Sequence, residues 1–203
     1  KFSSEIDYSL SDIQIKGTAK LDGFAGYDDG IKLYTRGDGS KGSDISRVFD
    51  RGLGVFNNSA RGQGPGEIVI KRSYFEKHLS NHFEFPRNFQ ASLIKEKELD
   101  SFAIDAISEK AALFVPFAQL PQWLGSIDEF SSQFLDIVGQ LEGGVDFDID
   151  GVVFEIVNPE LKEYMGSNRK FHRWQIAFKE NKEKAQVKVI SVTAQVGRTG
   201  KIT

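Results

Sequence analysis

The chain has 203 residues, of which 39% are hydrophobic and 12% aromatic, so it can bury a core the size of one domain. It contains no cysteine, which excludes disulfides, thiolate zinc sites and cysteine nucleophiles within this segment. The formal net charge of −3 excludes a globally basic nucleic-acid binder, so any contact with DNA must come from a local cluster of cations. Because the sequence has neither a long apolar run nor a basic-then-apolar leader, we expect a cytoplasmic protein that does not contact a membrane.

The first part of the sequence predicts short antiparallel strands joined by tight turns. Such strands are expected at residues 13–18, 24–27, 31–35 and 67–71. Ser43 is a candidate N-cap for a short helix that ends at Phe49. Residues 57–66 contain three glycines and one proline, which predicts a loop.

The remainder of the sequence mixes helices with further strands. Helices are expected at residues 73–79, 87–95 and 126–141, and strands at residues 111–119, 150–157, 173–178 and 186–196. Asn158 and Pro159 are typical of an N-cap and the first helical position after it. Because helices interrupt hairpins without a regular βαβ pattern, the sequence predicts an α+β fold with largely antiparallel sheets and flanking helices.

Residues 20–23 read Lys-Leu-Asp-Gly at a predicted junction between a strand and a turn. Lys-x-Asp-Gly is typical of covalent nucleotidyltransferases, in which the lysine amine attacks an α-phosphate and forms a phosphoramidate. The amine must be neutral to react, and neutralising an unperturbed lysine at pH 7 costs about 4–5 kcal/mol. The site must lower that cost by desolvation and neighbouring cations. Taken alone, these four residues more often form a solvated hairpin.

Five further segments follow this motif in order. They are residues 35–45 (Thr-Arg-Gly-Asp-Gly-x-x-Gly-x-Asp-Ile), 85–93 (Phe-Pro-Arg-Asn-x-x-Ala-Ser-Leu), 147–153 (Phe-Asp-Ile-Asp-Gly-Val-Val), 173–179 (Arg-Trp-Gln-Ile-Ala-Phe-Lys) and 195–203 (Gln-Val-Gly-Arg-Thr-Gly-Lys-Ile-Thr). In this order they resemble motifs of bacterial NAD-dependent DNA ligases. Residues 1–203 as a whole resemble the adenylation (nucleotidyltransferase) domain of these enzymes.

The resemblance implies a fold and a reaction. The fold would be an ATP-grasp-like nucleotidyltransferase core with the nucleotide cleft between sheets, in a segment without the N-terminal NMN-binding domain and the C-terminal oligonucleotide-binding (OB) domain. In the reaction, the lysine attacks NAD, releases nicotinamide mononucleotide, and passes AMP to a 5′-phosphate of nicked double-stranded DNA. Mg²⁺ would be held through few carboxylates and several waters. We expect the full-length protein to be a monomer.

The resemblance also implies the catalytic residues. Lys20 would be the nucleophile, and Asp22 would hold the nucleotide ribose or orient the lysine. Asp150 would be the acidic partner of a divalent cation or of the lysine itself. Lys179 would neutralise charge on the α-phosphate during transfer, since such reactions depend on positioning and electrostatic stabilisation.

Four further residues are implied in nucleotide binding. Arg36 would contact the nucleotide and add positive field around its phosphates. Glu67 would accept hydrogen bonds from the ribose hydroxyls. Arg87 would lie near the phosphates or the DNA backbone, and Phe117 is the nearest candidate for stacking on adenine.

Three positions depart from the ligase pattern. Glu155 stands where a phosphate-contacting lysine is usual, and it is expected to repel the nucleotide phosphates. Thr18 replaces the glutamate that reads the adenine amino group, and Pro65 replaces an arginine two residues before Glu67. These departures favour an alternative, a divergent and catalytically weak nucleotide- or DNA-binding relative. An ATP-using ligase or a capping-type enzyme of the same superfamily is a third, narrower reading.

Overall fold

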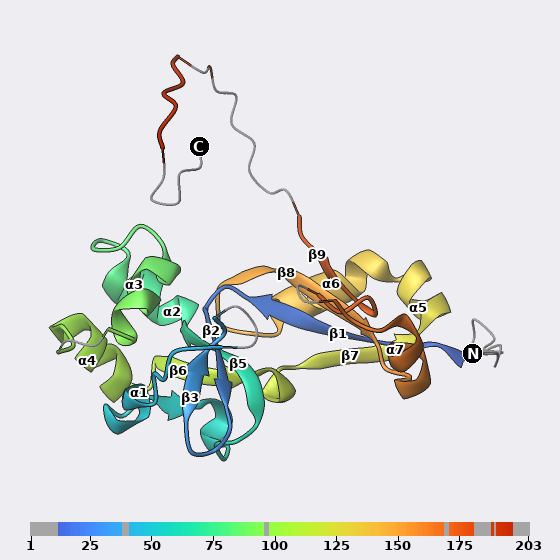
Figure 1. Ribbon diagram of the computed structural model, residues 1–203, viewed down its shortest axis with the longest axis horizontal. Helices are drawn as coiled ribbons and strands as arrows, with labels where there is room; N and C mark the ends of the chain where they lie inside the picture. The colour runs from blue at the N-terminus through green and yellow to red at the C-terminus, as the bar shows by residue number, and fades with distance from the viewer. Residues whose placement is uncertain are drawn as a thin grey trace.

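Two sheets lie along the long axis of the molecule, each with helices packed against it (Figure 1). The computed structural model describes residues 12–37, 41–95, 98–168, 171–180, 188 and 190–196. Within these ranges no helix is long and apolar enough to cross a membrane. The predicted mixture of helices with largely antiparallel sheets is confirmed.

The first sheet is antiparallel throughout. Its strands, in spatial order, are β7 (Gln122–Ser126), β1 (Gln14–Leu21), β8 (Ile149–Ile156) and β9 (Gln175–Phe178). In β1 every second residue is buried, the period expected of a strand with one face in a core. That face packs against α5 (Ile127–Ser132) and α6 (Phe134–Gly143). Lys20 lies on the opposite face of β1.

The second sheet carries the largest core. Its strands, in spatial order, are β3 (Leu33–Thr35), β2 (Phe24–Asp28), β5 (Gly64–Ile70), β6 (Ala112–Pro116) and β4 (Gly54–Val55). The β4–β6 pairing is parallel and the others are antiparallel. Against one face pack α1 (Arg47–Asp50), α2 (Arg72–Tyr74) with the π-helical turn at Phe75–Leu79, α3 (Pro86–Leu93) and α4 (Ser101–Ser108). Each large side chain fully buried there contributes about 1.5–3 kcal/mol.

A smaller hydrophobic cluster joins the two sheets. It combines Leu21 at the end of β1, Val69 in β5 and Phe147 just before β8, all nearly inaccessible to solvent. Phe147 meets Phe56, in the 3-10 turn at Phe56–Asn58, edge to face at 5.6 Å between ring centroids. The ends of β1, β5 and β8 are therefore fixed relative to one another.

The expected succession of hairpins is wrong at one point that matters for the site. β1 pairs with β7 and β8, whereas β2 pairs with β3 and β5, so the two strands lie in different sheets. The Asp22-Gly23 step is a crossing from one sheet to the other and does not close a hairpin. Local turn residues allow either outcome, and the shared core at the sheet junction decides between them.

Several predicted boundaries also differ. The first short helix starts at Arg47 after Ser46, while Ser43 pairs with Thr35 through two hydrogen bonds of 2.9 Å. The helix expected at residues 126–141 breaks at Gln133, whose ψ of 22° is not helical, and this separates α5 from α6. The strand expected at residues 111–119 ends at Pro116, where the 3-10 turn at Phe117–Gln119 begins.

Several elements are predicted wrongly or not at all, among them the short strand β4, for which the sequence predicts none. Residues 190–195, the described core of the strand expected at 186–196, lie in neither helix nor strand. α4 was not predicted, although Asp100 caps it by accepting a hydrogen bond from the Ala103 N–H at 2.9 Å. β7 was also missed. It pairs with β1, which is distant in the sequence, so no local hairpin pattern indicates it. In contrast, α7 (Pro159–Met165) begins where the sequence predicts.

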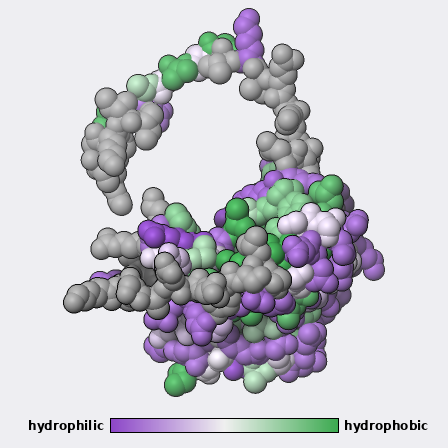
Figure 2. Space-filling model, turned by 90° about the vertical axis from the view of Figure 1, so that its right-hand side faces the viewer, coloured by the Kyte–Doolittle hydropathy of each residue, from purple (hydrophilic) through white to green (hydrophobic). Residues whose placement is uncertain are grey.

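The end of the molecule that carries α5 and α7 presents a mainly hydrophilic surface with scattered hydrophobic groups (Figure 2). Tyr164 on α7 and Leu124 on β7 are among the exposed hydrophobic side chains. Single exposed side chains of this kind are normal on a folded protein.

Candidate functional site

A cleft of about 410 Å³ opens where the two sheets meet. Its walls come from the ends of β1 and β8 in one sheet, from β2, β3 and β5 in the other, and from the start of α3. Six of the predicted site residues line it: Lys20, Asp22, Arg36, Glu67, Arg87 and Asp150. The volume lies within the range of small-molecule sites.

A carboxylate shared by two lysines marks the β1–β8 side of the cleft. Lys20 Nζ donates to Asp150 Oδ2 at 3.0 Å, and Lys179 Nζ donates to the same oxygen. The hydrogen bond from Lys179 lowers the pKa of Asp150, and the bond from Lys20 adds to this against the opposing effect of burial. Asp150 is therefore ionised at neutral pH. An incoming phosphate would compete with it for both ammonium groups.

A bulge and a glycine bring these three side chains together. Ala19 pairs with Val152 and Leu21 with Ile149, so three steps on β8 match two on β1, and Asp150 falls opposite Lys20. Gly151 has a φ of +111°, and a Cβ there would lie 2.1 Å from the Phe178 carbonyl oxygen. Only glycine therefore lets β9 approach β8 at this point, which places Lys179 beside Asp150.

Glu67 lies on the second sheet at the opposite wall. Its Oε2 accepts a hydrogen bond from the Gly23 N–H at 2.6 Å. A Cβ at position 23 would lie 2.6 Å from the Ile68 carbonyl oxygen and 2.8 Å from Glu67 Oε2, so the crossing between the sheets requires glycine. Burial raises the pKa of Glu67 to about 7, against the opposing effects of the Gly23 hydrogen bond and the Lys20 charge.

The raised pKa of Glu67 predicts a specific dependence of stability on pH. Between about pH 4.5 and pH 7 the folded protein keeps a proton that the unfolded chain releases, so the free energy of unfolding falls as pH rises through that window. The loss is at most on the order of 3 kcal/mol. Glu67→Gln keeps the acceptor without the charge, so urea unfolding at pH 8 should show a more stable protein, with little change at pH 4.5.

Glu155→Gln is the matched control for this measurement. Burial raises the pKa of Glu155, but hydrogen bonds and charges from Lys16 and Lys162 outweigh it and lower the pKa overall. Its contribution to stability is therefore present above its ordinary pKa and lost below it, so Glu155→Gln should be less stable than the parent at pH 8. A Glu67→Gln protein that is destabilised at pH 8 would contradict the account of Glu67.

Asp22 and the two predicted arginines complete the polar lining. Arg87 Nη1 lies 3.3 Å from Asp22 Oδ1, and the Asp22 N–H donates to the Asp148 carbonyl oxygen at 2.9 Å. The Arg36 residue is exposed, and its backbone N–H donates to the Ala25 carbonyl oxygen at 3.2 Å. With Lys20 these arginines give the cleft lining three cations beside the carboxylates of Asp22, Glu67 and Asp150. Lys179 does not line the cleft, but it lies beside it on Asp150. Cations of this kind can bind phosphate groups.

Other predicted positions lie outside this group. Phe117 is exposed on the 3-10 turn after β6 and does not line the cleft, so its role in adenine stacking stays a prediction. Residues 38–39 and 197–203, which belong to two of the motifs, are outside the described residues. Asp148 precedes β8 and pairs with Arg72 at 3.4 Å.

Glu155 does not have the surroundings that its sequence position suggested. Its Oε1 lies 2.6 Å from Lys16 Nζ and 3.4 Å from Lys162 Nζ, and it is absent from the cleft lining. Two cations therefore compensate its charge, and its effect on nucleotide phosphates stays a prediction. Thr18 lies between Lys16 and Lys20 on the same face of β1. Pro65 pairs with Tyr27 in the second sheet.

The carboxylates fit only a loosely held Mg²⁺. The described residues contain no group of three or more His, Asp or Glu side chains able to hold a metal. Mg²⁺ usually binds one or two carboxylates together with substrate phosphates and waters. Asp150 can serve in that way once phosphates draw a lysine away from Oδ2.

The fold and the cleft define a mixed α/β protein with a cleft at the junction of two sheets, lined by Lys20, Arg36 and Arg87 together with three carboxylates. Over its whole length the chain is similar to proteins named DNA ligase, with 66% identity over 203 residues to the one from Ruthia magnifica subsp. Calyptogena magnifica. It is 53% identical over 203 residues to the one from Shewanella baltica. The chain covers 33% and 31% of those two proteins, so it spans about one third of the curated relatives it matches. No family model matches the chain.

Proposed function

We propose that this chain is the adenylation domain of an NAD-dependent DNA ligase, and that Lys20 carries AMP. One observation carries the proposal: Lys20 and Lys179 meet on Asp150 in the cleft between the sheets, in a chain similar throughout to DNA ligases. A lysine nucleophile needs cations around it to favour its neutral form and to receive phosphate charge. Lys179, Arg36 and Arg87 supply them.

In the proposed first step, Lys20 Nζ forms a bond to the α-phosphorus of NAD while the bond from that phosphorus to the NMN phosphate oxygen breaks. Asp150 orients the amine through its hydrogen bond. Because the pKa of Asp150 is lowered, its carboxylate is a poor base for the proton on the Lys20 ammonium group. That proton passes to solvent when the phosphates of NAD displace the Lys20–Asp150 ion pair. Lys179 stabilises the negative charge that develops on the α-phosphate.

The lysyl-AMP then transfers AMP to the 5′-phosphate of nicked double-stranded DNA, and a 3′-hydroxyl displaces AMP to seal the nick. Glu67 and Asp22 would hold the ribose, and Arg87 the incoming phosphates. Mg²⁺, coordinated through Asp150 and the phosphates, would supply additional charge neutralisation. The contact with DNA needs only this local cluster of cations, in keeping with the net charge of −3.

Intact-mass spectrometry of the full-length protein tests the proposal. After incubation with NAD and Mg²⁺ we expect a mass increase of one AMP, localised to Lys20 by peptide mapping. An adduct formed from ATP and not from NAD would identify an ATP-using relative. An unmodified protein that still binds adenosine nucleotides would identify a catalytically weak binding relative, the reading favoured by Thr18.

A further inference from the structure

The segment that leads into β8 touches both sheets. A backbone bridge joins Phe147 to Lys71 at the end of β5, and the Arg72 N–H donates to the Asp146 carbonyl oxygen at 3.0 Å. The Phe147 ring is buried in the cluster between the sheets. Residues 146–148 therefore connect the end of β5 to β8, the strand that carries Asp150.

The side chain of Arg72 binds two consecutive residues of this segment. Its Nη2 donates to the Phe147 carbonyl oxygen at 2.5 Å, and its Nε lies 3.4 Å from Asp148 Oδ1. The neighbouring Ser73 reinforces the contact, because its N–H and hydroxyl donate to the two carboxylate oxygens of Asp146 at 3.0 and 2.6 Å. One planar guanidinium thus holds a carbonyl and a carboxylate on consecutive residues, a geometry that lysine does not reproduce.

Residues 146–148 determine the positions of two parts of the cleft, the backbone at Asp22 and the carboxylate of Asp150. The Asp148 carbonyl oxygen accepts the N–H of Asp22, which follows the nucleophile by two residues. Asp150 stands two residues further on and accepts hydrogen bonds from Lys20 and Lys179. A shift of residues 146–148 would therefore displace both the backbone after Lys20 and the carboxylate that orients it.

We propose that Arg72 is a positioning residue for the lysine nucleophile, acting through Asp148 on Asp22 and Asp150. Among the described residues its side chain donates to Phe147 and pairs with Asp148, which are not residues proposed to contact the nucleotide. Through them it fixes the separation of the cleft residues across the sheet junction. This inference rests on the proposed function for its kinetic consequence and on geometry alone for its structural one. A displacement of about 1 Å in a reacting group can lower a rate by about 100-fold.

The test uses Arg72→Gln in the full-length protein with two readouts. The rate of AMP adduct formation at saturating NAD should fall by about 10- to 100-fold, while the dissociation constant for NAD changes little. Hydrogen exchange of the Asp22 N–H, measured without nucleotide, should accelerate. Arg72→Lys should recover part of the rate. Should Arg72→Gln fail to fold, Ser73→Ala is the second variant. It removes the hydroxyl hydrogen bond to Asp146 and should lower the rate of adduct formation by a smaller factor.

Arg47→Gln is the matched control. Arg47 also donates to backbone carbonyls of a distant segment, those of Ile94 and Lys95, and none of these three residues lines the cleft. The proposal is overturned if Arg72→Gln slows adduct formation no more than Arg47→Gln does. If the parent protein forms no adduct, the proposed function fails, and hydrogen exchange alone decides the positioning role: unchanged exchange at Asp22 rejects it.

Discussion

Lys20→Arg should abolish AMP adduct formation in the full-length protein incubated with NAD and Mg²⁺. The guanidinium keeps the positive charge and the pairing with Asp150, so the cleft should stay intact. A guanidinium keeps its proton at neutral pH, so no neutral nitrogen is available to attack phosphorus. Intact-mass spectrometry should therefore show no added AMP, while NAD still binds. The loss should be complete, because a guanidinium at position 20 cannot form the bond to phosphorus.

Lys16→Arg is the control for this result. Lys16 lies on the same strand and the same face, and its Nζ pairs with Glu155 at 2.6 Å in place of Asp150. The variant should form the adduct at a rate close to that of the parent. An adduct that persists in Lys20→Arg would place the nucleophile elsewhere and remove the central residue of the proposed function.

Local patterns were enough to predict most strands and helices. The alternation in β1 and the Asn158-Pro159 start of α7 depend on neighbours in sequence, and both are found. Sheet membership is different, because it depends on contacts between distant residues. The Asp22-Gly23 step reads as a hairpin turn, yet Leu21 and Val69 share a core that draws the strands on either side of it into separate sheets.

The same distinction applies to the site. Lys20 and Asp150 are 130 residues apart, and only the order of motifs and the family resemblance grouped them. No sequence pattern pointed to Arg72, which follows a buried strand and carries no motif, or to the partners of Glu155. Lys16 reaches Glu155 across the β1–β8 pairing and Lys162 from the helix that follows. The motif position of Glu155 therefore did not indicate the two lysines that compensate its charge.

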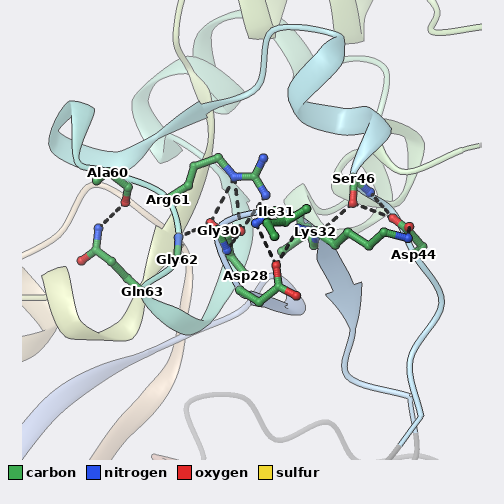
Figure 3. A network of polar contacts seen from close by, with 12 residues as sticks. Asp28, Gly30, Ile31, Lys32, Asp44, Ser46, Ala60, Arg61, Gly62 and Gln63 are labelled. Carbon is green, nitrogen blue, oxygen red and sulfur yellow. Dashed lines mark hydrogen bonds and ion pairs between the residues drawn. The ribbon is translucent and has the colours of Figure 1, made fainter.

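Arg61→Ala should lower the free energy of unfolding by about 3–5 kcal/mol, because it leaves the buried carboxylate of Asp28 without its cationic partner. Asp28, at the end of β2, is 1% exposed and lies 2.7 Å from Arg61 Nη2. The N–H groups of Gly62 and Gly30 also donate to it, at 2.9 and 3.1 Å. These partners lower the pKa of Asp28 even though burial acts in the opposite direction. Figure 3 shows the pair tying the β2–β3 turn to the loop before β5.

Lys32→Ala is the control, since Lys32 and Asp44 form a pair at 2.8 Å in the same network with both side chains well exposed (Figure 3). An exposed pair contributes about 0–1 kcal/mol, so its loss should be small. Because the pKa of Asp28 is lowered in the folded state, its stabilising effect is present above its ordinary pKa of 3.8 and is lost as pH falls. The Arg61→Ala deficit in urea unfolding should therefore be large at pH 7 and narrower at pH 3. Equal losses for the two variants at pH 7 would mean that water reaches Asp28 once Arg61 is removed.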